Sequence, residues 1–254
     1  MMPSTSPSRR RWAVASATVA ILLWALVAHL VDRDIVLPGP LRTLAYLGTM
    51  SSQWSTWEAI AATLRRVALS FSSNLVLALA LGMGAGFIQA LEEALKPLVT
   101  VMKAVPTMGV ILLSVIWFDS ETAVVFVTTL IVFPVLYSAV LSGVHHLDQG
   151  LIQMHRVFHI PLFTTLRRFL LPSLRPQLTA GIASGIGLSM KVVVAAEVLS
   201  QPGTGIGTMF QVERASLNTA GVFAWSLVVV VLTAGLDLLL AALKHRGEVS
   251  HARS

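Results

Sequence analysis

Six stretches of about 20 residues or more carry almost no charge, and this feature limits the fold more than any other. Because about 20 residues of helix cross a hydrocarbon core of about 30 Å, each stretch is long enough to span a bilayer. An isolated strand would leave its backbone unsatisfied in lipid, so helices are expected. We therefore predict an all-α integral membrane protein with about six transmembrane helices. The predicted spans are Trp12–Val31, Val67–Ala90, Leu98–Phe118, Thr122–Val144, Leu178–Leu199 and Val222–Leu243.

The composition supports a membrane environment. Only 12% of the residues are charged and the mean hydropathy is +0.78, whereas a soluble domain carries about 25% charged residues. The chain contains no cysteine, which excludes a disulfide framework, a cysteine-ligated metal site and a cysteine nucleophile. The sequence pI of about 10.5 fits basic flanks beside membrane spans better than a nucleic-acid partner. We expect membrane lipid and no nucleic acid as partners.

The positions of lysine and arginine predict the orientation of the spans. If the N-terminus is cytoplasmic, the inner segments hold eleven of these residues: Arg9, Arg10, Arg11, Lys96, Arg156, Arg167, Arg168, Arg175, Lys244, Arg246 and Arg253. The outer segments then hold five: Arg33, Arg42, Arg65, Arg66 and Arg214. Because cytoplasmic loops carry an excess of cationic residues, this distribution predicts that both termini are cytoplasmic. The basic N-terminus, residues 1–11, is expected to precede an uncleaved first helix.

A basic segment of residues 145–177 separates the fourth and fifth predicted spans. Apolar residues recur in it at helical spacing. Pro161 is expected to divide it into two short helices, and Pro172 and Pro176 to end the second. Such an amphipathic element can lie on anionic lipid headgroups or form a docking surface for a cytoplasmic partner. The residues alone favour neither alternative.

Two charged residues fall within the fifth predicted span, Lys191 and Glu197. A charge in the membrane is costly, so it faces a partner or a water-filled cavity. Six positions on one helix separate the two side chains by about 240°, so a direct pair is not expected. Either each bonds to a neighbouring helix, or Lys191 lines a pathway and attracts an anionic group. The candidate pathway or gate residues are Lys191, Glu197, Gly203, Gly205, Gly207 and Pro106.

Glycine pairs with G-x-x-x-G spacing occur in the second and fifth predicted spans. They are Gly82 with Gly86, and Gly181 with Gly185. Because glycine has no side chain, such pairs allow two helices to approach closely.

The segment between the fourth and fifth spans resembles the cytoplasmic EAA motif of ABC importer permeases. In that family the motif reads E-A-A-x-x-x-G, followed at a fixed spacing by I-x-L-P. Here the first half is Gln153-Met-His-Arg-Val-Phe-His159 and the second ends in Phe169-Leu-Leu-Pro172. The second half fits well, whereas Gln153 replaces the glutamate and His159 the glycine.

Further segments resemble the taurine, aliphatic sulfonate and nitrate permease branch of this family, in the same order along the chain. They are Leu37-Pro-Gly-Pro40, Ile60-Ala-Ala-Thr-Leu-Arg-Arg66, Val105-Pro106 with Val115-Ile-Trp-Phe118, Val194-Ala-Ala-Glu-Val-Leu199 and Gly203-Thr-Gly-Ile-Gly207. The resemblance runs from about Trp12 to about Leu243.

The resemblance implies a permease subunit of a bacterial inner-membrane importer that carries a small, anionic solute such as a sulfonate or nitrate, or a vitamin precursor. Its implied partners are ABC ATPase subunits, a second permease copy in a homodimer and an extracytoplasmic substrate-binding protein. ATP and Mg would bind to the ATPase, since this chain has no G-x-x-x-x-G-K-[ST] motif. The implied domains are the basic N-terminus, a permease domain of residues 12–243 with the coupling loop 145–177, and a cytoplasmic tail of residues 244–254. The implied ATPase-coupling residues are Gln153, His155, Arg156, His159, Arg167, Arg168 and Pro172.

Two other classes are alternatives. A secondary transporter needs acidic relay residues within its spans, and Asp237 stands alone in the last one. An intramembrane enzyme needs a G-x-S-x-G serine, paired aspartates or an H-E-x-x-H motif, and the sequence has none of these. We therefore expect a non-catalytic subunit without catalytic residues, metal ligands or a cofactor of its own.

Overall fold

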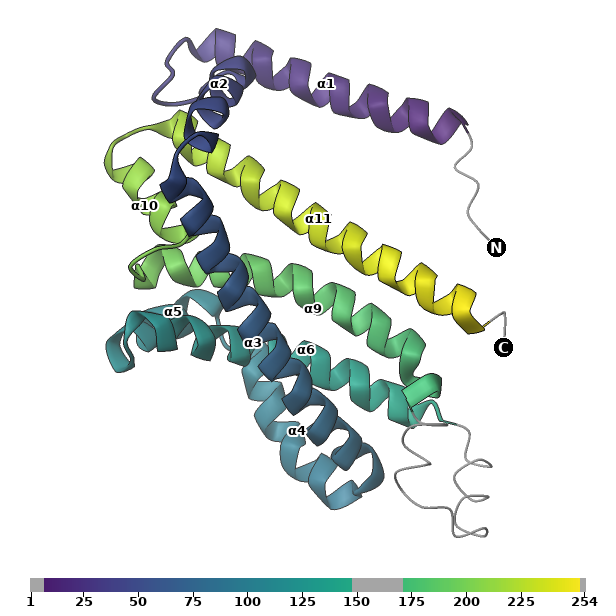
Figure 1. Ribbon diagram of the computed structural model, residues 1–254. Coiled ribbons are helices and arrows are strands. Elements are labelled where there is room, and N and C mark those ends of the chain that lie inside the picture. Colours follow the sequence, from purple (N-terminus) through teal and green to yellow (C-terminus); the bar gives the residue numbers. More distant parts are fainter. Residues whose placement is uncertain (1–6, 148–170, 252–254) are drawn as a thin grey trace.

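The computed structural model describes residues 7–147 and 171–251. Within these ranges the chain is helical, as predicted (Figure 1). The helices are α1 (Pro7–Val31), α2 (Pro40–Ser51), α3 (Trp54–Phe87), α4 (Gln89–Ala104), α5 (Thr107–Trp117), α6 (Ser120–His145), α9 (Leu171–Ser200), α10 (Ile206–Ala215) and α11 (Thr219–His251).

Five single helices are long and apolar enough to cross a membrane, namely α1, α3, α6, α9 and α11. The bent pair α4 and α5 gives a sixth if it counts as one span. The prediction of about six transmembrane helices is therefore confirmed. The beginning of α1 and the end of α11 lie on the same side of the molecule as the end of α6 and the beginning of α9 (Figure 1).

The third predicted span is not the straight helix that was expected over Leu98–Phe118. Helix α4 starts at Gln89, and the chain turns by 99° before α5. Val105 is extended, and Pro106 is the residue before the first turn of α5. Proline cannot donate a backbone hydrogen bond and disfavours helix in the residue before it, so Pro106 explains the break.

The second span also starts earlier than predicted. Arg65 and Arg66 were expected in an outer loop, but they lie inside α3, which begins at Trp54. Its 34 residues correspond to about 51 Å of helix, well above the hydrocarbon thickness of about 30 Å. The predicted span Val67–Ala90 therefore covered only the apolar part of α3.

The start of α9 also differs from the prediction. Pro176 was expected to end a short helix, but it lies inside α9.

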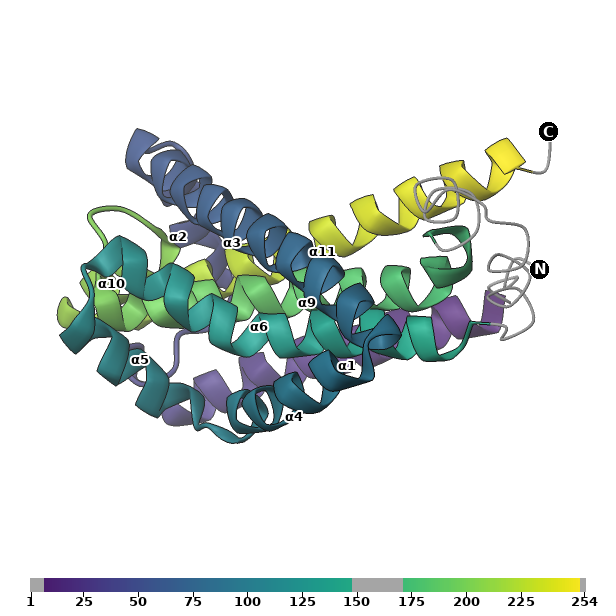
Figure 2. The same cartoon turned by 90° about the horizontal axis from the view of Figure 1, so that it is seen from below.

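Helices α3, α6 and α9 form the centre of the molecule (Figure 2). The predicted glycine pairs lie where these helices meet. A Cβ atom on Gly86 would be 2.4 Å from Cγ1 of Val144 on α6, and one on Gly185 would be 2.7 Å from Cδ2 of Leu136. The close helix approach expected from the G-x-x-x-G spacing is therefore present.

Helix α1 lies at the edge of this bundle. None of the residues in its apolar window, Val14–Val31, is buried. Trp24 in its second half contacts two other segments: Nε1 donates to the Pro38 carbonyl over 3.1 Å, and the ring stacks on Phe223 of α11 with ring centroids 5.6 Å apart.

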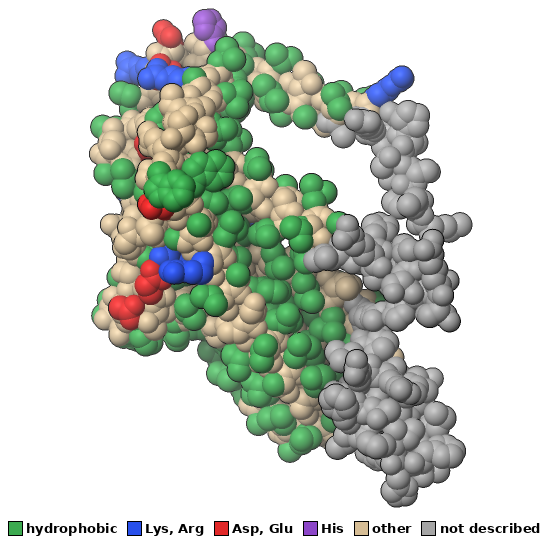
Figure 3. All heavy atoms as spheres, viewed as in Figure 1, with side chains coloured by type: hydrophobic (Ala, Val, Ile, Leu, Met, Phe, Trp, Pro, Cys, Tyr) green, Lys and Arg blue, Asp and Glu red, His purple; other side chains and the backbone are tan. Residues whose placement is uncertain are grey.

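Charged side chains gather at the end of the molecule that carries α2 and α10, which we call the α10 end (Figure 3). Hydrophobic side chains cover most of the visible face beyond it. This distribution fits a protein whose middle faces lipid and whose α10 end faces water. At the α10 end, Asp119 caps α6 by accepting from the Glu121 and Thr122 amides over 3.1 Å each. The hydrogen bonds from Thr122 hold the pKa of the Asp119 carboxyl below its ordinary value.

Candidate functional site

A buried charge cluster joins three helices at the α10 end. Arg66 of α3 and Glu197 of α9 are 3% and 0% exposed, and Nη1 of Arg66 donates to Oε1 of Glu197 over 2.7 Å. The same Nη1 donates to the Thr204 carbonyl over 2.7 Å. On its other side, Nε of Arg66 donates to Oε2 of Glu121, at the start of α6, over 2.8 Å. One guanidinium group therefore holds α3, α6, α9 and the loop after α9 together.

The cluster also fixes the start of α10. Glu197 Oε2 accepts from the Gly207 amide over 2.9 Å. Thr63 lies one turn before Arg66 on α3; its Oγ1 is 2.9 Å from Glu197 Oε2 and accepts from the Ile206 amide over 2.8 Å. The first amides of a helix have no partner within the helix. Here a carboxylate and a hydroxyl from two other helices supply those partners.

Two of the predicted loop glycines are needed for this packing. A Cβ atom on Gly207 would be 2.4 Å from Cβ of Glu197, and one on Gly205 would be 2.8 Å from Nη1 of Arg66. Gly203 is different, because no atom lies within 4 Å of the position its Cβ would take. Although the three glycines form one motif in the sequence, close packing requires a glycine at Gly205 and Gly207 and not at Gly203.

The last turns of α10 are held by a separate contact. The Tyr46 hydroxyl of α2 donates to Oε1 of Glu213 over 2.6 Å, and Nδ2 of Asn218 donates to Oε2 over 2.7 Å. Burial, followed by the hydrogen bond to Glu213, raises the pKa of Tyr46 to about 12. Tyr46 and Glu213 are both partly exposed, so this contact is more open to water than the Arg66 cluster.

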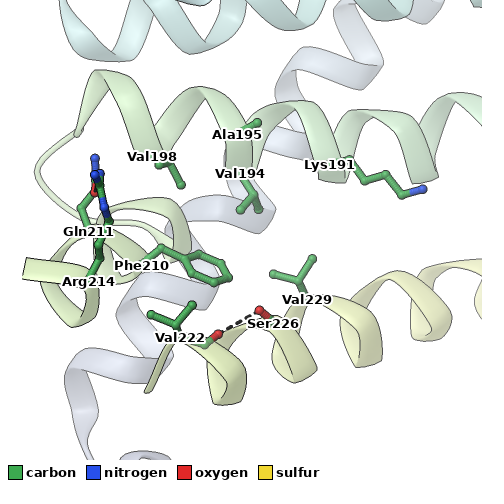
Figure 4. A pocket seen from close by; sticks show the side chains of 10 residues that line it. All are labelled: Lys191, Val194, Ala195, Val198, Phe210, Gln211, Arg214, Val222, Ser226 and Val229. Carbon is green, nitrogen blue, oxygen red and sulfur yellow. Dashed lines mark hydrogen bonds between the residues drawn. The ribbon is translucent and has the colours of Figure 1, made fainter. Parts of the chain in front are cut away.

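A groove of about 500 Å³ opens beside α10, between α9 and α11 (Figure 4). Most of its lining is apolar, with Phe210 projecting between the helices. Its polar side chains are Lys191, Gln211, Arg214 and Ser226. In Figure 4, Lys191 lies toward one end, and Gln211 and Arg214 toward the other. The lining therefore contains two cations and no carboxylate, which favours an anionic or anion-bearing guest.

The structure separates Lys191 from Glu197, as their spacing on one helix predicted. Glu197 bonds to α3 and to the start of α10, which is the structural alternative considered for it. Lys191 is exposed and lines the groove. Pro106 lies at the bend between α4 and α5 and is not among the groove residues. In the part of the chain that the structure describes, no group of three or more His, Cys, Asp or Glu side chains could hold a metal ion.

Most of the predicted coupling residues lie outside the residues that the structure describes. Those outside are Gln153, His155, Arg156, His159, Arg167 and Arg168. Pro172 belongs to the first turn of α9.

Sequence reasoning singled out Glu197 and Gly207 but missed the other residues that hold α10. Arg66 was assigned to an outer loop and Thr63 was not singled out, although three positions place both on one face of a helix. A cation three residues after a threonine in an otherwise apolar stretch was the available signal. Tyr46 and Glu213 gave no comparable signal, because these partners are 167 positions apart in the sequence.

Comparison with known proteins places this geometry in context. Residues 75–248 match the protein family described as "Binding-protein-dependent transport system inner membrane component". The taurine transport system permease protein of Escherichia coli (strain K12) is 26% identical over 249 residues, covering 94% of this chain and 90% of that protein.

Two further relatives have related names. A putative aliphatic sulfonates transport permease protein of Bacillus subtilis (strain 168) is 25% identical over 94% of this chain and 89% of its own length. The nitrate import permease protein of Leptolyngbya laminosa is 32% identical over 64% of this chain and 58% of its own length. All three relatives are transport permeases by name.

Proposed function

This chain belongs to the family of binding-protein-dependent transport system inner membrane components, and we propose that it is the permease subunit of an ATP-driven ABC importer. It is a multi-pass membrane protein in the branch of taurine, aliphatic sulfonate and nitrate permeases. In this proposal the chain forms the translocation pathway in the bacterial inner membrane, with both termini cytoplasmic. The family match over residues 75–248 is the observation that carries the proposal.

The proposed solute is small and carries an anionic group. The groove beside α10 supports this, because Lys191 and Arg214 line it without a carboxylate. Taurine, sulfonates and nitrate, which the relatives' names mention, share sulfonate or oxyanion chemistry. We propose Lys191, Glu197, Gly203, Gly205, Gly207 and Pro106 as pathway or gate residues, with Lys191 in contact with solute and Glu197 in support of the gate.

Replacement of Lys191 tests the solute class. In cells or proteoliposomes that contain the complete transporter, Lys191→Met is expected to reduce uptake of taurine, an alkanesulfonate or nitrate, because a cation of the pathway is lost. Lys103→Met is a matched control, since Nζ of Lys103 donates to Ser138 on α6 over 2.7 Å and Lys103 is not among the groove residues. Unchanged uptake and unchanged preference among the three solutes in Lys191→Met would contradict this role.

We further propose that two copies form a homodimer that encloses the pathway. Helix α1 has no buried residue in its apolar window, and the groove opens beside α11, so both offer surface to a second copy. Cross-linking in membranes and the mass of the purified complex test this arrangement. A complex that contains one copy of this chain would refute it.

Coupling to the ATPase is proposed to use the loop 145–177. ATP and Mg would bind to the partner ATPase subunits, and Gln153, His155, Arg156, His159, Arg167, Arg168 and Pro172 would form the contact. Arg167→Glu with Arg168→Glu is expected to reduce co-purification of the ATPase. Lys244→Glu with Arg246→Glu reverses two charges of the C-terminal tail and serves as the control. Full co-purification after the loop replacement would exclude this contact.

An extracytoplasmic binding protein is proposed to deliver the solute. The purified complex in proteoliposomes should hydrolyse ATP faster when the loaded binding protein is added. Uptake that needs a proton gradient but no ATP would instead support a secondary transporter.

A further inference from the structure

We propose that α10 is a hinged wall of the groove, with its pivot at the buried Glu197 contact and its releasable end at the Tyr46–Glu213 hydrogen bond. Tyr46 is then a positioning residue that sets how far the groove is open. The link between α10 motion and solute passage rests on the proposed function. The motion itself is a property of this chain alone and can be measured without solute.

The start of α10 has the properties of a pivot. Ile206 is 0% exposed, and its amide and that of Gly207 are held by side chains from α3 and α9. A Cβ atom on Gly207 would be 2.5 Å from the Val194 carbonyl, so the backbone of α10 lies directly against α9. Detaching this end would leave the buried amides of Ile206 and Gly207 without partners and would take one donor from Glu197, and each buried group left unsatisfied costs about 1–3 kcal/mol. The start of α10 is therefore the more costly end to detach.

The other end of α10 is held more weakly. Tyr46 and Asn218 are the side chains that donate to Glu213, and all three are partly exposed. Arg214 and Leu217, next to this contact, are exposed. Water can replace an exposed hydrogen bond at small net cost, about 0.5–1.5 kcal/mol for a typical one. Release at this end thus costs less than release at the Glu197 end, where the donors are buried.

Tilting α10 would change the groove directly. Phe210, Gln211 and Arg214 belong to α10 and line one side of it (Figure 4). Ten residues of helix are about 15 Å long, so a small rotation at Gly207 moves Arg214 much farther than Phe210. The opposite wall on α9 would stay in place, whereas residues 216–218, which join α10 to α11, would have to bend. The wall that moves thus contains one of the two cations of the groove.

Spin-label distances test the hinge, and the absence of cysteine in the chain makes the labelling specific. A label on Val212 of α10, which is 53% exposed, is paired with one on Leu77 of α3, which is 45% exposed. The full-length protein is measured in lipid nanodiscs by double electron–electron resonance, diluted with unlabelled protein. We expect Tyr46→Phe to add a second population at a changed Val212–Leu77 distance.

Two comparisons separate a hinge from general loosening. Tyr137→Phe removes the only other tyrosine hydroxyl, in the packed region between α3 and α6, and is expected to leave the distribution unchanged. A label on Gly203, where a side chain has space, reports the loop before the pivot and should not move in Tyr46→Phe. Equal shifts of both labels would mean that α10 moves as a whole and would overturn the pivot.

An unchanged Val212–Leu77 distribution in folded Tyr46→Phe would overturn the proposal. If that variant does not fold, Glu213→Gln weakens the same contact from the α10 side and must give the same second population. Loss of uptake without a distance change would count against the hinge while leaving the proposed importer function intact. A distance change in a protein that fails to transport would support the hinge and count against that function.

Discussion

Removal of Arg66 should destabilise the protein more than removal of its neighbour Arg65. In Arg66→Met the fully buried carboxylate of Glu197 loses the one cationic partner that it has among the described residues. Removing one partner of a buried ion pair costs about 3–5 kcal/mol. The ion pair between Arg66 and Glu121 adds little to the free energy of unfolding, because the Glu121 side chain is 53% exposed and water screens the pair. We therefore expect Arg66→Met to lower the free energy of unfolding by about 3–5 kcal/mol.

The pair itself can be isolated with a double-mutant cycle. Glu197→Gln keeps the shape and leaves Arg66 bonded to Glu121, so we expect a smaller loss, about 1–3 kcal/mol. The double variant leaves no buried charge unpaired at this position. Its loss should be smaller than the sum of the single losses by about 0.5–3 kcal/mol, the range seen for groups in contact.

Equilibrium unfolding in mixed detergent micelles measures these values. Tryptophan fluorescence and circular dichroism report the transition as the denaturing detergent is raised. Arg65→Met is the control, because Arg65 is exposed, and it should stay within about 0.5 kcal/mol of the parent protein. A loss below about 1 kcal/mol for Arg66→Met, or strict additivity in the cycle, would refute the reasoning.

Three further predictions concern packing and pH. Gly207→Ala should lower the free energy of unfolding by about 1–3 kcal/mol through overpacking, since the new Cβ would meet three atoms of α9 at 2.4 to 2.6 Å. Gly203→Ala should leave the free energy of unfolding unchanged, and equal unfolding midpoints for the two variants would contradict this reasoning. Gly86→Ala should cost a similar amount, because its Cβ would be 2.4 Å from Val144 Cγ1, and a further Val144→Ala replacement should recover part of the loss. The pKa of Tyr46, raised to about 12, means that folding favours its neutral form, so this stabilisation is complete below about pH 10 and is lost as the pH rises through the folded value. Tyr46→Phe should flatten that part of the stability–pH curve, and an unchanged slope would rule the contribution out.

Much of the fold could be predicted from hydrophobicity alone. The cores of α1, α6, α9 and α11 coincide with predicted spans, because long apolar runs have one stable form in lipid. The bend at Pro106 could have been inferred from the proline itself, but the apolar residues on both sides concealed it. The beginning of α3 was missed because its first turns contain polar and charged residues, which a hydropathy pattern assigns to a loop.

The candidate site was harder to predict than the spans. Glu197 was recognised because a charge in an apolar run has to have a partner. Its partner Arg66 lies 131 positions away along the chain, and periodicity within one helix carries no information about such distant pairs. The groove residues Gln211 and Arg214 belong to a short amphipathic helix that composition cannot distinguish from a loop.

The bend between α4 and α5 restricts which molecules can lie next to it. The last carbonyls of α4 and the first amides of α5 have no partners inside their own helices. In hydrocarbon each such group costs several kcal/mol, so acyl chains are excluded from the surface around Val105 and Pro106. That surface must be hydrated or covered by protein. Rotations of the bundle about the membrane normal that would turn this surface toward lipid are therefore excluded.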